Sequence, residues 1–151
     1  MREKLNKELK NSVIAKNTIR IKTLRLILAA IKDRDIVARS SGNMSGISDD
    51  DIITLLKKMI KQREESIILY KKGKRDDLVK NEESEIDIIT SFLPEQLSVD
   101  EITKIVKATI EAENATSIKD MGMVISKLKE KHSKSMDFSI ASKIIREILL
   151  G

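Results

Sequence analysis

Apolar residues recur at steps of three and four along almost the whole chain, and this spacing constrains the fold more than any other feature. Residues three and four positions apart share one face of a helix, whereas a strand alternates at every second residue. One proline and five glycines are too few for the many turns of a sandwich or a barrel. The sequence therefore predicts an all-α fold.

The pattern predicts seven helices. Four are expected at residues 2–16, 18–40, 49–72 and 76–92, and three shorter ones begin near Ser98, Ser117 and Asp137. Ser98 is followed by Glu101 in the pattern of a capping box, and Gly73 is placed to end the third helix.

The first two helices have clear apolar faces. The residues expected in the core are Leu5, Leu9 and Val13 in the first helix and Ile21, Leu24, Leu28 and Ile31 in the second. A second row on the helix at 18–40 is expected to face solvent, and it consists of Lys22, Arg25, Ala29 and Lys32.

Pro94 is the only proline, and it divides the pattern. Proline restricts the residue before it to extended conformations, so a helix is expected to stop there. We expect an elongated four-helix bundle domain at 1–93, a joint at 94–97 and a small three-helix domain at 98–151. The smaller domain lies near the lower size limit for a core that is stable by itself.

The charge is unevenly placed. The net charge is +5, and residues 1–39 alone hold 11 Lys and Arg against 4 Asp and Glu. Such a segment favours an anionic partner. The alternative is an ordinary solvated helix surface in a lysine-rich chain.

Side chains that carry most catalysis are scarce. Cysteine is absent, and His132, the only histidine, lies in a polar run at an expected helix end. One histidine without cysteine does not make a transition-metal site, and Gly42 and Gly46 lack the Lys-Ser/Thr of a phosphate loop. We expect no catalytic residue, no metal and no cofactor, and an enzyme is the least favoured class.

No apolar run approaches the roughly 18 residues that cross a bilayer. The first ten residues alternate charges and lack the apolar stretch of a secretory signal. We therefore expect no membrane partner and a cytoplasmic location.

Basic residues on the second and third helices favour a nucleic-acid partner, because phosphates bind cations that the fold brings to one face. Only three aromatic residues are present, Tyr70, Phe92 and Phe138, and these are too few for a base-stacking platform. The RNA would then be structured. The alternative is that these lysines pair with nearby acids such as Glu64 and Asp76.

Gly122 lies inside an expected helix, where glycine costs about 1 kcal/mol relative to alanine. Close approach of another helix, or of a partner such as an RNA backbone, would explain it. Packing in the protein core is the simpler interpretation.

Short motifs follow one another in a characteristic order. They are Lys22-Thr23-Leu24-Arg25-Leu26, Ala29-Ala30-Ile31-Lys32, Lys61-Gln62-Arg63, Gly73-Lys74-Arg75-Asp76-Asp77-Leu78, Phe92-Leu93-Pro94-Glu95-Gln96-Leu97-Ser98 and Asp120-Met121-Gly122. In this order they resemble the GatB/YqeY family, specifically its free-standing YqeY-like proteins, over residues 2–149.

The resemblance implies a four-helix domain followed by a three-helix tail. A similar tail is part of the B subunit of tRNA-dependent amidotransferase and of some glutaminyl-tRNA synthetases, where it grips tRNA. Nothing matches the amidotransferase active centres, so a label of carbon–nitrogen ligase with glutamine as amido donor would come from the family name. Phe138 stands where relatives often have glycine, and it is expected to crowd an approaching RNA backbone.

The leading hypothesis is a helical module without catalytic residues that binds structured RNA, with tRNA favoured. The residues predicted to contact RNA are Lys61, Arg63, Lys71, Lys74, Arg75, Lys119, Gly122, Lys127 and Lys131. The rival hypothesis is a protein-interaction adaptor that docks on an aminoacyl-tRNA synthetase or amidotransferase subunit. This rival predicts an exposed apolar patch on one face of the bundle.

Overall fold

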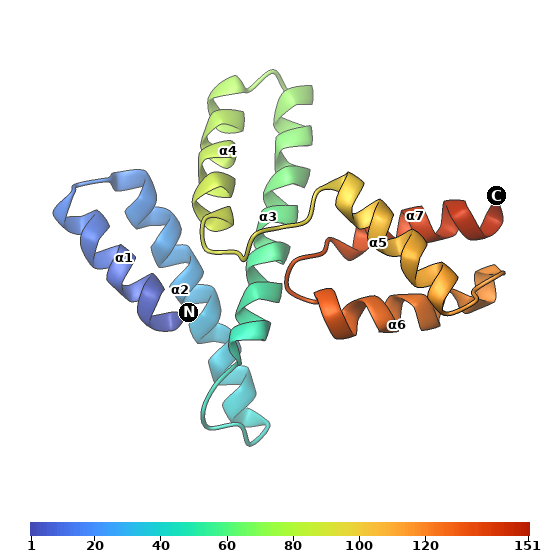
Figure 1. Ribbon diagram of the computed structural model, residues 1–151. Coiled ribbons are helices and arrows are strands. Elements are labelled where there is room, and N and C mark those ends of the chain that lie inside the picture. The colour runs from blue at the N-terminus through green and yellow to red at the C-terminus, as the bar shows by residue number, and fades with distance from the viewer. The chain divides into compact units, whose positions relative to one another are not determined.

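The computed structural model describes all 151 residues. They form two compact units, Met1–Leu93 and Pro94–Gly151. Both units consist of helices, and no strand is present, so the predicted all-α fold is confirmed (Figure 1). No helix is both long enough and apolar enough to cross a membrane.

The N-terminal unit contains two helical hairpins. Its helices are α1 (Arg2–Ile14), α2 (Thr18–Ser40), α3 (Asp49–Lys72) and α4 (Asp76–Thr90). Helix α1 lies against α2 and α3 lies against α4, while α2 also contacts both helices of the second hairpin. Helix α2 is therefore the element that joins the two hairpins.

One apolar cluster holds the four helices together. Its buried members are Leu5, Leu24, Ile27, Ile31, Ile52, Leu56, Met59, Ile88, Ile89 and Phe92. Full burial of such a side chain contributes about 1.5–3 kcal/mol. Each helix supplies at least one member, so none of the four can be removed without opening this core.

The C-terminal unit has its own core. Its helices are α5 (Val99–Ala112), α6 (Met121–His132) and α7 (Phe138–Leu150), with a 3-10 turn at Ile118–Asp120 before α6. The fully buried side chains include Ile102, Val106, Val124, Leu128, Met136 and Ile145. The predicted capping box is present, with the Glu101 amide donating to Ser98 Oγ at 3.2 Å and the Ser98 amide donating to Glu101 Oε2 at 2.7 Å.

Three helices end on a left-handed residue that is not glycine. Lys16, Lys74 and Asn114 follow the C-caps of α1, α3 and α5 with φ of 55°, 57° and 53°. In α3, the Arg75 amide then donates to the Tyr70 carbonyl at 2.9 Å, which is the Schellman arrangement.

The sequence predicts the end of α3 at Gly73, and Gly73 is the C-cap of that helix. Because Lys16 turns the backbone after α1, that helix ends before the predicted residue 16.

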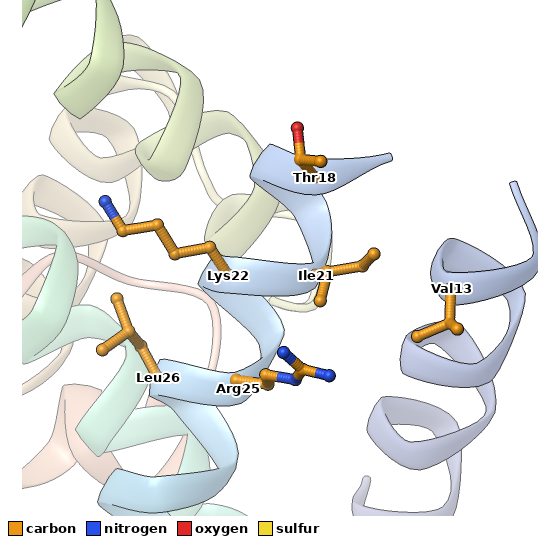
Figure 2. A pocket seen from close by; sticks show the side chains of 6 residues that line it. All are labelled: Val13, Thr18, Ile21, Lys22, Arg25 and Leu26. Atoms are coloured by element: carbon orange, nitrogen blue, oxygen red, sulfur yellow. The ribbon is translucent and has the colours of Figure 1, made fainter. Parts of the chain in front are cut away.

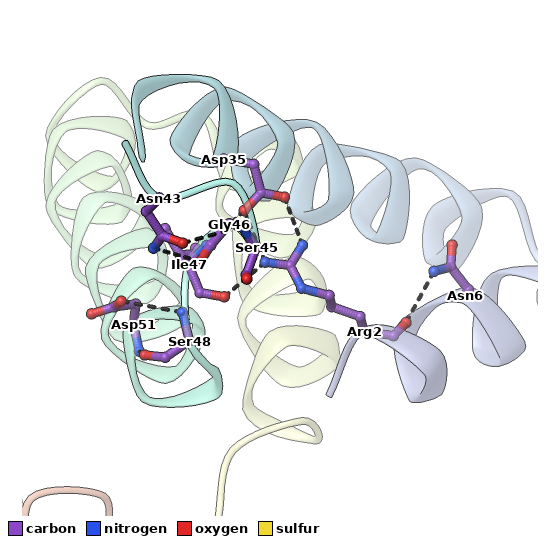
Figure 3. A network of polar contacts seen from close by, with 9 residues as sticks. All are labelled: Arg2, Asn6, Asp35, Asn43, Ser45, Gly46, Ile47, Ser48 and Asp51. Carbon is purple, nitrogen blue, oxygen red and sulfur yellow. Dashed lines mark hydrogen bonds and ion pairs between the residues drawn. The ribbon is translucent and has the colours of Figure 1, made fainter. Parts of the chain in front are cut away.

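A polar network ties the start of α1 to the far end of α2 (Figure 3). Arg2 donates from Nη1 and Nη2 to the two Asp35 carboxylate oxygens at 2.6 and 2.8 Å, and Nη2 also donates to the Ile47 carbonyl at 2.8 Å. The Ile47 amide donates to Asp35 Oδ1 at 2.9 Å. Gly46 lies beside them with φ of 84°, and a Cβ there would collide with the Asp35 carboxylate. One carboxylate thus positions the 41–48 loop.

The Asp35 carboxylate should give the fold a measurable acid dependence. Hydrogen bonds from Arg2, and then from the Ile47 amide, lower the pKa of Asp35 to about 2. A pKa lowered by folding stabilises the protein above the unfolded pKa of about 4, and this contribution is lost as pH falls from about 4 toward 2. We predict that Asp35→Asn removes this part of the pH dependence, measured as the urea midpoint from pH 2 to 6.

Asp87→Asn is the control, because Asp87 is exposed on α4 and makes no ion pair. A midpoint that falls equally steeply with acid in Asp35→Asn and in the unaltered protein would contradict the prediction.

Candidate docking surface on the N-terminal unit

An open apolar groove runs along the outer side of α2 next to the end of α1. Its volume is about 540 Å³ and its lining consists of Val13, Thr18, Ile21, Lys22, Arg25 and Leu26. Figure 2 shows Ile21 and Arg25 pointing from α2 toward Val13, whereas Lys22 and Leu26 project on the other side of α2. The groove is thus lined mainly by aliphatic groups from two helices.

Val13 was predicted to lie in the core, and this prediction is wrong. Val13 is 49% exposed, and Ser12 is the buried residue of that turn. A helix advances about 100° per residue, so the seventh residue after Leu5 returns to its direction better than the eighth. The Ser12 hydroxyl is buried without penalty, since it donates to the Glu8 carbonyl at 2.7 Å.

Exposed apolar side chains continue beyond the groove. Leu26 is 42% exposed, and Ile36 and Val37 further along α2 are 52% and 63% exposed. The buried face of α2 is occupied by Thr23, Leu24, Ile27 and Ile31. As predicted, Lys22, Arg25, Ala29 and Lys32 lie on the exposed face.

The rim of the groove is positive. Lys22 Nζ lies 3.7 Å from Glu85 Oε1 on α4, and its side chain is still 70% exposed. Arg25 is exposed and makes no ion pair. A ligand that fills the groove with apolar groups would therefore gain from negative charge beside Arg25.

Glu85 is the one acidic residue buried in the N-terminal unit. Arg63 on α3 donates from Nε to Glu85 Oε2 at 2.9 Å, and from Nη1 to the Met59 carbonyl at 3.2 Å. Together with Lys22, this arrangement gives one buried carboxylate two cationic neighbours on different helices.

The five RNA-contact residues predicted on α3 and its turn are in different situations. Arg63 is held inside by Glu85, and Arg75 pairs with Asp77 at 3.2 Å. Lys61, Lys71 and Lys74 are exposed. Lys61 lies ten residues before Lys71, which is about 15 Å along a helix. The structure therefore brings only the residues around the α3–α4 turn together.

The four RNA-contact residues predicted in the C-terminal unit also lie in different places. Lys127 and Lys131 line a groove of about 320 Å³ between α5 and α6, with His132 beside them. Lys119 lies in the 3-10 turn, and Gly122 lies in the first turn of α6. Phe138, expected to crowd a turn, packs against the core of the unit, with Lys129 Nζ 5.8 Å from its ring centroid.

Gly122 has no neighbour that explains it. It is exposed, and a Cβ added there meets nothing within 4 Å, so the interpretation as a core glycine is wrong. We predict that Gly122→Ala raises the stability of the C-terminal unit, by at most the interior helix-propensity difference of about 1 kcal/mol, because Gly122 lies in the first turn of α6. The contrasting variant is Gly46→Ala, which should lower the stability of the N-terminal unit. Thermal unfolding followed by NMR signals of each unit measures both, and a destabilised Gly122→Ala would contradict the expectation.

The ion cluster at Glu85 gives a third prediction. Glu85→Ala leaves the largely buried Arg63 guanidinium without its partner, and we expect a loss of about 3 kcal/mol in unfolding free energy. Replacing both residues with apolar ones, as Arg63→Met with Glu85→Leu, should cost less. The exposed Glu83→Ala on the same helix is the control and should stay within about 0.5 kcal/mol in urea unfolding. Equal losses for Glu85→Ala and Glu83→Ala would contradict the assignment.

The protein is all-helical, has an open apolar groove, and contains no group of His, Cys, Asp and Glu arranged to hold a metal ion. The sequence profile of the Yqey-like protein family matches residues 2–149. The chain belongs to this family, which confirms the resemblance found in the motifs.

Three fungal relatives have the same name, "Altered inheritance of mitochondria protein 41, mitochondrial". The one from Saccharomyces cerevisiae strain YJM789 is 30% identical over 95% of this chain and 80% of its own length. The one from Pyrenophora tritici-repentis is 27% identical over 97% of this chain and 79% of its own length. The one from Lachancea thermotolerans is 39% identical over 59% of this chain and 46% of its own length.

These names overturn the predicted function. They refer to the inheritance of mitochondria and contain no reference to RNA or translation. A module that binds structured RNA is therefore the wrong function, and the cations behind that prediction include Arg63, which is held inside the bundle. The names do not say what the relatives bind, so tRNA, a synthetase and an amidotransferase stay untested predictions as partners.

The predicted cytoplasmic location is also wrong by this comparison, because all three relatives are named as mitochondrial. Composition and charge do not distinguish the interior of an organelle from the cytoplasm. The prediction rested only on the lack of an export signal, which has no bearing on that distinction.

Proposed function

We propose that this protein acts in the inheritance of mitochondria, the process for which its relatives are named, and that it acts by docking a polypeptide helix in the groove between α1 and α2. The observation that carries the proposal is the groove itself, an aliphatic surface of two helices with a cationic rim. Exposed aliphatic side chains that cluster in this way mark interaction sites.

The shape and chemistry of the groove favour a polypeptide. Its walls are mostly apolar, and it is open along α2 rather than closed around a small molecule. Small-molecule sites bury most of their ligand and add several convergent polar groups. Here the polar groups are a threonine and two cations at the edge.

A helix is the form of polypeptide that suits this surface. The backbone amides and carbonyls of α2 are used within the helix, so the groove has no edge to which an extended strand could bond. An amphipathic helix satisfies its own backbone and presents side chains at steps of three and four. Its apolar side chains would cover Val13, Ile21 and Leu26, and its carboxylates would approach Arg25.

Replacement of the relative in Saccharomyces cerevisiae tests both parts of the proposal. The chain, directed to mitochondria by a leader peptide, is expected to restore normal mitochondrial inheritance to cells that lack the relative. Leu26→Asp places a charge in the groove and is expected to abolish the restoration. Ile68→Asp is the matched control, since Ile68 is 56% exposed on α3 away from the groove, and it should restore inheritance fully.

The measured quantity is the fraction of daughter cells without mitochondrial DNA, together with the urea unfolding midpoint of each variant. Failure of the unaltered chain would count against the shared process. Restoration by a folded Leu26→Asp variant would count against the groove.

A further inference from the structure

The exposed face of α2 has an order that the groove alone does not require. Outward residues along this face are Lys22, Arg25, Leu26, Ala29, Lys32, Asp33, Ile36 and Val37, all exposed. They follow steps of three and one, which keeps them on one side of a helix. The smallest side chain, that of Ala29, lies at the centre of the row.

Charges of opposite sign lie at equal distances from this centre. Arg25 is four residues before Ala29 and Asp33 is four residues after it. Both are exposed, and neither forms an ion pair within its own chain. A partner that carries the same two charges in reverse order could pair with both of them. Its carboxylate would then face Arg25, and its cation would face Asp33.

One pair of apolar residues has the same symmetry, and two further pairs place a lysine opposite an aliphatic side chain. Ile21, in the groove, is eight residues before Ala29, and Val37 is eight residues after it. Leu26 and Lys32 are three residues on either side, and the aliphatic stem of a lysine can cover a leucine. Lys22 and Ile36 pair in the same way at seven residues.

We infer that the helix docked in the groove is α2 of a second copy of this chain, packed antiparallel about a two-fold axis at Ala29. This inference rests on the proposed function, because it identifies the polypeptide that the groove accepts. A two-fold contact repeats each pair twice, so it contains two Arg25–Asp33 ion pairs and two Ile21–Val37 contacts. The small Ala29 at the axis lets the two backbones approach closely. Ile36 and Val37 of each copy then cover the groove of the other.

Contact of one helix face with another covers less surface than a typical stable interface, so the dimer is weak. We expect a dissociation constant on the order of 10–100 µM at low salt. Exposed ion pairs are screened by salt, so the constant should rise several-fold between about 50 and 500 mM salt.

Charge exchange gives the decisive test, with sedimentation velocity from about 5 to 500 µM as the measurement. Arg25→Asp and Asp33→Arg should each reduce self-association at least tenfold, because each brings like charges together across the axis. The double variant Arg25→Asp with Asp33→Arg should dimerise again. An equal mixture of the two single variants should also dimerise, since one chain then has carboxylates at both positions and the other has guanidinium groups at both.

Covalent trapping gives an independent readout, because the chain contains no cysteine. Ala29→Cys, on the axis, should form a disulfide dimer on mild oxidation at about 50 µM, since its two copies come within bonding reach. Ile68→Cys, exposed elsewhere on the N-terminal unit, should not. A monomer up to the highest concentration, or failure of the mixture and of the double variant to associate, would overturn the inference.

The outcome is separable from that of the proposed function. If the chain stays monomeric while Leu26→Asp still abolishes mitochondrial inheritance, the groove binds a different polypeptide and only the self-contact is wrong. If the charge-exchange variants follow the expected pattern while Arg25→Asp restores inheritance, the dimer stands and is not needed for that process.

Discussion

The buried carboxylate of Glu85 constrains the N-terminal unit more than any other single group. A charge removed from water must be compensated by cations and hydrogen bonds at fixed positions, or it shifts the balance against folding. Glu85 on α4 meets the largely buried Arg63 at 2.9 Å, and this pair ties α3 to α4. It also lies 3.7 Å from the exposed Lys22 of α2, a contact that water screens and that adds little.

The orientation of α2 follows from its buried apolar residues, and the contact between Lys22 and Glu85 agrees with it. With Lys22 directed toward α4, the side that holds Leu24, Ile27 and Ile31 faces the core, and the side that holds Arg25, Ala29 and Asp33 faces outward. The network of Arg2, Asp35 and Ile47 holds the other end of α2 in the same orientation. Helix α2 is therefore held by its buried apolar face and, at one end, by half-buried charge, while its outer face has no cover from the rest of its unit. This combination of a rigid helix and an uncovered face is what a docking surface requires, because little conformational entropy is lost when a partner binds.

The sequence predicted the helices well and the site poorly, and the reasons are physical. Spacing of apolar residues and the N-terminal caps at Ser48, Ser98 and Asp137 are local signals, and all three caps are present in the structure. Burial of a given side chain depends on which face the neighbours cover, and this is a property of the whole bundle. The spacing of Val13 from Leu5 and Leu9 predicts that it is buried, but in the structure Ser12 is the buried residue of that turn.

The number of free cations is smaller than the sequence suggests for a related reason. Arg63 belongs by sequence to a basic stretch, and only the folded chain brings Glu85, 22 residues away, to within 2.9 Å of it. Arg2 and Arg20 in the basic first segment likewise have partners, in Asp35 and Glu8. A count of charges along a segment therefore overestimates the charge available to a partner. A better sequence signal was present in the symmetric order of Arg25, Ala29 and Asp33, but its meaning depends on knowing that this face of α2 is exposed.

A symmetric row of this kind also limits what else the face can bind. A nucleic acid or an anionic surface would be attracted to Arg25 and Lys22 but repelled by Asp33. Asp33 lies further along α2, before the apolar residues at its end. A uniformly acidic helix would gain at Arg25 but would leave the exposed Asp33 opposed by a like charge. Only a helix with an acid and a base eight residues apart satisfies both positions, and α2 is itself such a helix. The same two residues that would weaken a generic anionic contact therefore favour the self-contact, and this difference in free energy, rather than the apolar area alone, selects the partner.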